Sequence, residues 1–269
     1  MSGPPARPTI VVTEADGPGR TLAARLREAG AVVRMLPVVS HGPAPNPAPL
    51  ARALARLPEY AWAAFTSARA VNAVCQDAAW TQWPWDTATR PRIAAVGPVT
   101  RAVLLANGMP VALCPDLPGA RPLAQAMIAA EGGSMSGRTV FWPRSDIARP
   151  DLGDALRSAG AELVAPVAYC TRPDRPPGLA EFLSDLGADR IDCVTFLSPS
   201  GAAALAALMP GATLSPLARL AVVASVGPAT SAALAALGAP PAVEAPSRTA
   251  GGLATALLSC FGLSESDTP

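Results

Sequence analysis

Val96-Gly97-Pro98-Val99-Thr100 and Val226-Gly227-Pro228-Ala229-Thr230 are two copies of one sequence element. In both copies an apolar run ends at Gly-Pro-x-Thr, and an Ala/Leu-rich pattern with helical spacing follows. Glycine permits a close approach of the backbone, and proline is favourable in the first turn of a helix. Each copy therefore predicts a strand that ends at a tight turn, with a helix beginning directly after it.

Other positions share the interval between the two copies. The two glycines are 227 − 97, or 130, residues apart, and the same interval separates Gly30 from Gly160. Phe65-Thr66-Ser67 corresponds to Phe196-Leu197-Ser198 at an interval of 131 residues. The chain is therefore expected to contain two similar units. Two units that face one another form a cleft in which a sizeable ligand can be held from both sides.

Apolar strand patterns alternate with helical patterns along the whole chain, which is typical of parallel sheets covered by helices. The segment 139–168 repeats the strand–helix–strand order of 9–36. We expect strands at 9–12, 31–36, 62–65, 92–96, 111–114, 139–142, 162–168, 193–196, 220–224 and 242–245. The fold class predicted from this order is α/β.

Two turn-rich segments, near 37–49 and 169–177, are expected to be linkers because prolines and glycines are concentrated in them. They are compatible with two organisations: lobes that follow one another along the chain, or a middle segment inserted into an outer domain. Periodicity alone does not decide between these organisations.

Composition excludes several classes of protein. Half of the 269 residues are apolar, yet no uninterrupted apolar run reaches the roughly 18 to 20 residues that a membrane span requires. We therefore expect a soluble protein. The segment 1–8 is rich in proline and glycine and shows no signal peptide, so a cytoplasmic location is expected. The formal net charge of +1 argues against a nucleic-acid-binding surface.

The reactive side chains available to the protein are few. All 21 basic residues are arginine, which excludes a Schiff-base lysine and a P-loop lysine. The one histidine, His41, lies in the turn-rich segment 41–47 and is expected to be a solvated loop residue. The five cysteines form no Cys-x-x-Cys pair, so most are expected to be small buried hydrophobes. Cys170 is the exception, because it neighbours Tyr169 in a segment expected near the site.

Hydroxyl groups follow several of the predicted strands. Ligands of open α/β sheets bind at the carboxyl ends of strands, where helix N-termini also present N–H groups. Thr100 and Thr230 in the repeated turns, Ser67, and Ser198 with Ser200 fall at such positions. Helix capping is the alternative role for each of them. Together they predict a site of amides and hydroxyls suited to carboxylates or phosphates.

Arginine and tyrosine side chains complete the set of candidates. Arg144 directly follows a predicted strand and Arg69 follows Ser67, although either is equally suited to a solvated surface position. Tyr169 directly follows the predicted strand 162–168, and its phenol can donate a proton. The other tyrosine, Tyr60, is expected to be a packing residue.

Taken in order, these motifs resemble the uroporphyrinogen-III synthase family over nearly the whole chain. The stretches that carry the resemblance are Phe65-Thr66-Ser67-Ala68-Arg69-Ala70-Val71, Ala95-Val96-Gly97-Pro98-Val99-Thr100, Trp142-Pro143-Arg144-Ser145, Tyr169-Cys170-Thr171, Phe196-Leu197-Ser198-Pro199-Ser200-Gly201, Val226-Gly227-Pro228-Ala229-Thr230 and Ala245-Pro246-Ser247-Arg248-Thr249. Each motif is weak alone, and it is their ordered set that is specific.

The resemblance implies two flavodoxin-like lobes joined by a two-strand linker, with 1–37 plus 172–269 as an outer domain and 38–171 as an inserted domain. It implies a lyase that cyclises hydroxymethylbilane with inversion of ring D and loss of water, without metal or organic cofactor. By the same analogy Tyr169 assists departure of the hydroxyl. Thr100, Thr230, Ser67 and Ser198 then hold substrate carboxylates alongside main-chain amides.

Further expectations follow from the resemblance. A monomer is expected, without nucleic-acid or membrane partners, and with a transient handover of substrate from hydroxymethylbilane synthase. Two departures from the family pattern concern the site. The family often has Thr-Arg-Pro after the first strand, whereas here Thr13 is followed by Glu14-Ala15, so the basic group expected there is missing and Arg20 is the candidate to replace it. Cys170 stands where the family commonly has a different residue.

The rival interpretation is a non-catalytic ligand-binding or regulatory module. A third interpretation, a flavodoxin-like or sugar-phosphate enzyme, is weaker because no Gly-rich phosphate loop is present.

Overall fold

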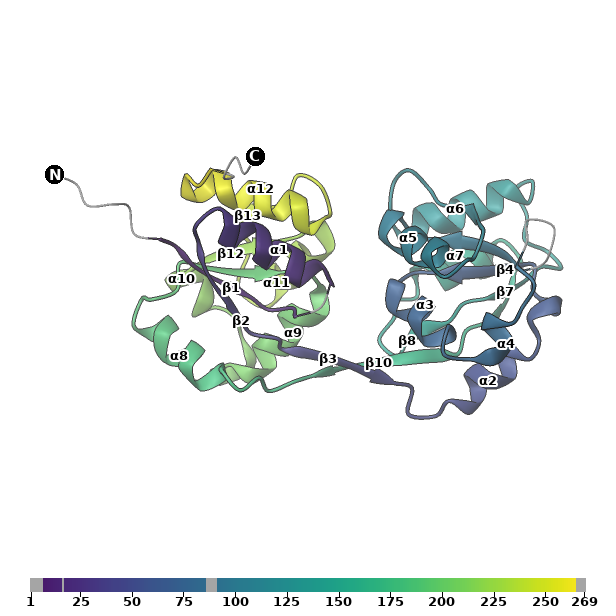
Figure 1. The fold of residues 1–269 in the computed structure, drawn as a ribbon, viewed down its shortest axis with the longest axis horizontal. Coiled ribbons are helices and arrows are strands. Elements are labelled where there is room, and N and C mark those ends of the chain that lie inside the picture. Colours follow the sequence, from purple (N-terminus) through teal and green to yellow (C-terminus); the bar gives the residue numbers. More distant parts are fainter. Residues whose placement is uncertain (1–6, 16, 86–90, 265–269) are drawn as a thin grey trace. The chain divides into compact units, whose positions relative to one another are not determined.

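The computed structural model describes residues 7–15, 17–85 and 91–264. The chain divides into two compact units, one formed by Met1–Ser40 with Arg172–Pro269 and the other by His41–Thr171. We call them the outer unit and the middle unit. Both are parallel sheets flanked by helices (Figure 1), so the fold class predicted from the sequence is confirmed.

The outer unit contains a five-stranded parallel sheet in the order β13-β12-β11-β1-β2. In the chain order of this unit alone, that arrangement is 5-4-3-1-2, the flavodoxin-like order. The strands are β1 (Thr9–Val12), β2 (Val32–Met35), β11 (Cys193–Phe196), β12 (Val222–Ser225) and β13 (Val243–Glu244).

The middle unit repeats this sheet with its strands in the order β6-β5-β4-β7-β9, all parallel. The strands are β4 (Trp62–Phe65), β5 (Arg92–Ala95), β6 (Val111–Leu113), β7 (Thr139–Phe141) and β9 (Glu162–Val164). The β7–helix–β9 pair takes the place that β1–helix–β2 has in the outer unit, but it comes last instead of first. The sequence repeat therefore corresponds to a repeated sheet.

Alternating side chains of the central strands pack on opposite faces, as the two-residue period of a strand requires. In β1, Ile10 and Val12 pack against α1 (Gly17–Glu28) and α12 (Ala250–Phe261), which lie side by side in Figure 1. Val11 points to the other face. That face is covered by α8 (Leu179–Gly187), α9 (Pro199–Leu208), α10 (Leu217–Leu220) and α11 (Pro228–Ala236).

The sheet of the middle unit is covered on both faces in the same way. Trp62 and Ala64 of β4 pack with α6 (Ala120–Ala130) and α7 (Asp151–Ser158), whereas Ala63 and Phe65 pack on the other face. The helices there are α2 (Ala48–Leu54), α3 (Ala68–Val74), α4 (Ala78–Thr81) and α5 (Pro98–Ala106), with a short 3-10 turn at Leu57–Glu59. A second 3-10 turn, Pro210–Ala212, belongs to the outer unit.

The segments expected to be linkers form strands where the chain passes between the units. β3 (Val39–Pro43), β10 (Val167–Pro173) and β8 (Arg144–Ser145) make a three-stranded sheet in the order β3-β10-β8. The two-strand linker that the resemblance implies therefore corresponds to β3 and β10, which pair with one another. The single strand expected at 162–168 was wrong, because it is divided into β9 and β10 on either side of Ala165-Pro166.

Smaller differences concern element ends. The strand expected at 220–224 begins at Val222, since 217–220 forms α10. Part of the tail expected to fray, 262–269, lies outside the described residues. None of the helices within the described ranges is long and apolar enough to cross a membrane.

Candidate active site

In the middle unit, the turns after β4 and β5 lie next to one another at the carboxyl edge of the sheet. Phe65 of β4 pairs with Ala95 of β5. Ser67 and Gly97 each follow this pair by two residues, so the pairing brings their turns together. The outer unit repeats the arrangement, because Phe196 of β11 pairs with Ser225 of β12 and Ser198 and Gly227 follow by two residues.

Ser67 has two partners. It is the N-cap of α3, where its Oγ accepts the backbone N–H of Ala70 at 3.1 Å. The same Oγ lies 3.1 Å from the hydroxyl of Tyr169. The capping role considered from the sequence is therefore present, together with a contact to the candidate proton donor.

The two tyrosines lie in different environments. Tyr60 is fully buried, donates its hydroxyl to the carbonyl of Ala53 at 2.9 Å and stacks on Phe141 with ring centres 5.4 Å apart. Its interpretation as a packing residue is confirmed. Tyr169 is half-buried and lies within β10, not after the end of a strand as expected. Its phenol reaches the hydroxyl of Ser67, which belongs to the turn after β4.

The repeated turns begin helices without help from their threonines. The N-caps of α5 and α11 are Gly97 and Gly227, and neither helix has a side-chain cap hydrogen bond. Thr100 and Thr230, in the first turns of these helices, are only 4% and 2% exposed. Capping, the alternative role for these two threonines, is thus excluded.

Glycine is needed in these turns because neighbouring loops approach closely. A Cβ on Gly97 would lie 3.1 Å from Cβ of Pro118. At Gly227, with φ of 153°, it would lie 3.2 Å from Cγ of Arg248. The two turns therefore differ in their neighbour: a proline in the middle unit and an arginine in the outer unit.

Arg144 and Arg69 are both half-buried in the middle unit. The guanidinium carbon of Arg144 lies 5.9 Å from the centre of the Trp142 ring, and its Nη1 donates to the carbonyl of Ser145 at 3.2 Å. Trp142 in turn donates its indole N–H to Thr66 Oγ1 at 3.2 Å. Thr66 was not selected as a candidate from the sequence, although its position next to Ser67 in the turn after β4 could have indicated a place at the site. Arg69 lies in the first turn of α3.

Ser198 and Ser200 lie at the corresponding turn of the outer unit. Ser198 caps α9 by accepting the N–H of Gly201 at 3.1 Å, and its Oγ lies 3.1 Å from that of Ser200. Thr13, another residue that the sequence analysis did not select as a site, is 2% exposed and donates to the carbonyl of Thr195 at 2.8 Å. The edge is thus lined by hydroxyl groups.

Arg20 has a local role at the beginning of α1. Arg20, the possible substitute for a missing arginine, is exposed and donates its Nε to the carbonyl of Ala15 at 3.0 Å. It therefore binds its own loop at the beginning of α1, which gives it a structural role.

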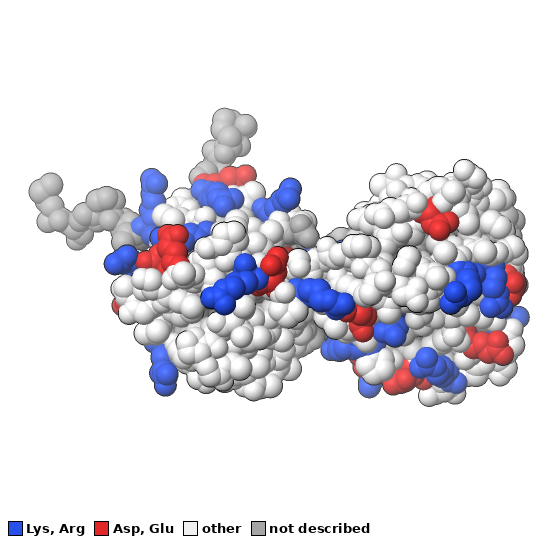
Figure 2. All heavy atoms as spheres, turned by 90° about the horizontal axis from the view of Figure 1, so that it is seen from below, with Lys and Arg blue, Asp and Glu red and all other residues white. Residues whose placement is uncertain are grey.

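The expectation that most of the cysteines are buried was wrong, because Cys75 and Cys114 are half-buried and Cys260 is exposed. Cys170 and Cys193 are buried, and burial raises the pKa of the Cys193 thiol, so this thiol stays protonated. Among the described residues, no group of three or more His, Cys, Asp or Glu side chains converges as a metal site would. Figure 2 shows basic and acidic side chains interspersed on the visible face, without a large patch of one sign.

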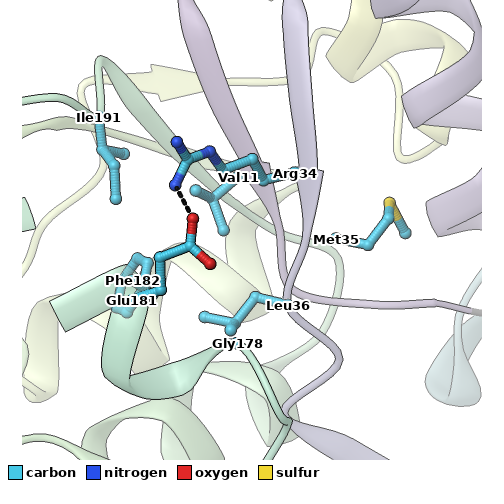
Figure 3. Close-up of a pocket in the computed structure, with 8 residues that line it drawn as sticks. All are labelled: Val11, Arg34, Met35, Leu36, Gly178, Glu181, Phe182 and Ile191. Carbon is cyan, nitrogen blue, oxygen red and sulfur yellow. Dashed lines mark hydrogen bonds and ion pairs between the residues drawn. The ribbon is translucent and has the colours of Figure 1, made fainter. Parts of the chain in front are cut away.

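A pocket of about 280 Å³ lies elsewhere, in the outer unit. It is lined by Val11, Arg34, Met35, Leu36, Gly178, Glu181, Phe182 and Ile191 (Figure 3), and none of these residues is a sequence candidate. Arg34 of β2 pairs with two carboxylates of α8, Glu181 at 3.3 Å and Asp185. The positive charge of Arg34 is thus directed to α8, and the pocket is not the candidate active site.

Fold and turns together define a class of α/β protein in which one chain forms two flavodoxin-like sheets, each with hydroxyl-bearing turns after its central strands. The family model described as "Uroporphyrinogen-III synthase HemD" matches residues 20–255. A uroporphyrinogen-III synthase from Synechococcus elongatus is 32% identical over 254 residues, covering 93% of this chain and 94% of that protein. The chain belongs to the uroporphyrinogen-III synthase family.

Solved structures share the fold. A mutant uroporphyrinogen III synthase from the extremely thermophilic bacterium Thermus thermophilus matches with a TM-score of 0.64 at 18% identity, over 96% of this chain and 99% of that chain. The uroporphyrinogen-III synthetase of Helicobacter pylori matches with a TM-score of 0.59 at 16% identity, over 94% and 99%.

Proposed function

We propose that the protein is a lyase that cyclises hydroxymethylbilane to uroporphyrinogen III, inverting ring D and releasing water. Family membership supports this reaction. The structural observation that carries the proposal is the 3.1 Å contact between the hydroxyls of Tyr169 and Ser67 at the carboxyl edge of a sheet. A phenol at that edge is the side chain best suited to donate a proton to a leaving hydroxyl.

Hydrogen-bond polarity supports Tyr169 as the donor. Ser67 Oγ already accepts the N–H of Ala70 at the start of α3, so its own proton is available for the phenol oxygen. With Ser67 donating, the phenol proton is directed to the substrate. A helix N-terminus and a hydroxyl behind the phenol stabilise the negative charge that develops on its oxygen as the proton leaves.

The remaining candidates are proposed to bind the carboxylates of the substrate. In the middle unit these are Thr100, Arg69 and Arg144, and in the outer unit Thr230, Ser198 and Ser200. Pyrrole nitrogens drive departure of the hydroxyl, so the protein has mainly to fold a flexible chain and favour the inverted closure. That is catalysis by orientation, for which fixed hydroxyls and amides suffice.

Product analysis tests the proposal. Purified protein supplied with freshly generated hydroxymethylbilane is expected to yield the type III isomer in preference to the spontaneously formed type I. Heat-denatured protein is the control, and it is expected to leave type I as the product. Type I alone from the folded protein would instead favour the non-catalytic binding module.

The two buried threonines are expected to act in binding. Thr100→Val and Thr230→Val keep the shape of the side chain and remove the hydroxyl, so each should raise KM by the equivalent of roughly 1 to 3 kcal/mol of binding free energy, with little change in kcat. Thr255→Val, at an exposed position of α12, is the matched control. Unchanged steady-state kinetics for either buried variant would remove that threonine from the substrate site.

The proposal includes a cytoplasmic monomer that receives its substrate by transient handover from hydroxymethylbilane synthase. Size-exclusion chromatography with light scattering checks the monomer: a stable dimer would contradict this part and leave the reaction intact.

A further inference from the structure

His41 lies beside Tyr169, contrary to its expected place in a solvated loop. It belongs to β3 and is half-buried. Its Nδ1 lies 3.3 Å from Thr171 Oγ1, and its ring centre lies 6.1 Å from that of Tyr169 with the planes inclined by 68°. Tyr169 and Thr171 are two residues apart on β10, so their side chains point to the same face of the strand.

A short chain of hydrogen bonds continues from Thr171 to a carboxylate. The hydroxyl of Ser145 donates to Asp146 Oδ1 at 3.1 Å, and Ser145 Oγ lies 3.2 Å from Thr171 Oγ1. Asp146 also accepts the backbone N–H of Thr171 at 2.9 Å. Ser145 and Thr171 are both 8% exposed, so the middle of this series of hydrogen bonds is shielded from water.

The number of protons available determines the direction of this series of hydrogen bonds. A carboxylate only accepts, so the single proton of Ser145 goes to Asp146. The contact between Ser145 and Thr171 then uses the proton of Thr171, and Thr171 Oγ1 accepts from the imidazole. His41 Nδ1 therefore carries a hydrogen, and the ring is oriented by a bond that leads through two hydroxyls to Asp146.

We infer that His41 is a positioning residue for the reaction: its Nδ1–H, donated to Thr171, holds the imidazole against Tyr169 and so keeps the phenol on Ser67. The inference rests on the proposed function and adds a residue to it. Tyr169 is then held from two sides, by a hydrogen bond at its hydroxyl and by an inclined aromatic contact at its ring. Such aromatic pairs are favourable beyond the area that they bury.

The tautomer of His41 provides a test that does not need activity. The sequence contains one histidine, so the protein without an affinity tag, grown with isotope-labelled histidine, gives a single pair of imidazole nitrogen signals by NMR. With the ring in its neutral form, the signals are expected to show the proton on Nδ1. Thr171→Val should shift the equilibrium away from this tautomer. A wild-type ring that carries its proton on Nε2 overturns the inference.

A double-mutant cycle tests the effect on catalysis. His41→Leu is expected to lower kcat on the order of 10-fold with KM nearly unchanged, because a small misplacement of a reacting group is costly. In the Tyr169→Phe background the same substitution should have no further effect, since there is no hydroxyl left to position. Ser40→Ala, at the neighbouring exposed position of β3, is the control and should retain wild-type kinetics.

The outcomes separate the two proposals. If His41→Leu lowers kcat equally in the wild type and in Tyr169→Phe, or in neither, His41 has no positioning role. The proposed function still stands in that case, provided that the wild-type protein yields the type III product. Type I product alone from the wild type removes the proposed function itself. Unfolding free energies of the variants, measured alongside, identify any loss of kcat that arises from unfolding.

Discussion

Tyr169→Phe is expected to lower kcat by about 10²-fold, the lower end of what a positioned proton donor contributes. The substitution keeps the ring and its contact with His41, and it removes only the hydroxyl that lies 3.1 Å from Ser67 Oγ. Tyr169 is half-buried and, within the described residues, its hydroxyl contacts a single other hydroxyl, so the fold should tolerate the change. Substrate binding, which depends on other groups in the proposal, should be affected little, and the loss should be found in kcat, measured in steady-state assays.

Tyr60→Phe is the matched control within the same unit. Tyr60 is fully buried and its hydroxyl bonds the carbonyl of Ala53, so its loss is expected to lower the free energy of unfolding by about 1 kcal/mol. Its kcat should stay at the wild-type value. If both variants lower kcat equally at equal stability, Tyr169 has no special part in the mechanism.

Glu131→Ala is expected to have the largest effect on stability. The Glu131 side chain is 9% exposed and pairs with both Arg92 and Arg138. It also accepts the indole N–H of Trp62 at 3.1 Å, while the Arg92 guanidinium lies 3.9 Å from the centre of the Trp62 ring. The substitution removes the anion that two arginines share. Because the two arginine side chains are 39% and 42% exposed, their charges stay partly solvated, and the loss of unfolding free energy is expected to be about 1.5 to 3 kcal/mol.

This cluster joins elements that are distant in the sequence. Glu131 is the C-cap of α6, and Trp62 and Arg92 are the first residues of β4 and β5. The cluster therefore lies at the amino edge of the sheet, opposite the candidate site. Below its melting temperature the variant should retain wild-type kcat.

Chemical denaturation measures the effect of Glu131→Ala, with Asp154→Ala as control. Asp154 forms an exposed ion pair with Arg157, with side chains 66% and 57% exposed, and such pairs contribute little. A loss for Glu131→Ala no greater than that of the control would show that the cluster is not stabilising.

Central strands were the most predictable elements. The expected bounds 9–12, 62–65 and 193–196 are those of β1, β4 and β11, which lie in the interior of their sheets. Strands buried on both faces have continuous apolar runs, and these runs are visible in the sequence. Edge strands are partly exposed and short, and β13 contains two residues, fewer than the expected 242–245.

Candidate site residues were predictable where local chemistry places them. A hydroxyl after an apolar strand and before a helix is recognisable, so the capping positions of Ser67 and Ser198 were predicted correctly. The surroundings of Tyr169 were not recognisable. Thr171 and His41 are 130 residues apart in the sequence, and the proline- and glycine-rich setting of His41 indicated a turn.

Local patterns in the chain were enough to predict the α/β class, the internal repeat and the positions of the Gly-Pro-x-Thr turns, because these depend on periodicity and on the backbone freedom of single residues. Three-dimensional packing was required to show that 39–43 is a strand, that Tyr169 meets Ser67, and that His41 reaches Thr171. These contacts arise from pairing between segments far apart in the chain, and a local pattern carries no signal of which distant segment will become its neighbour.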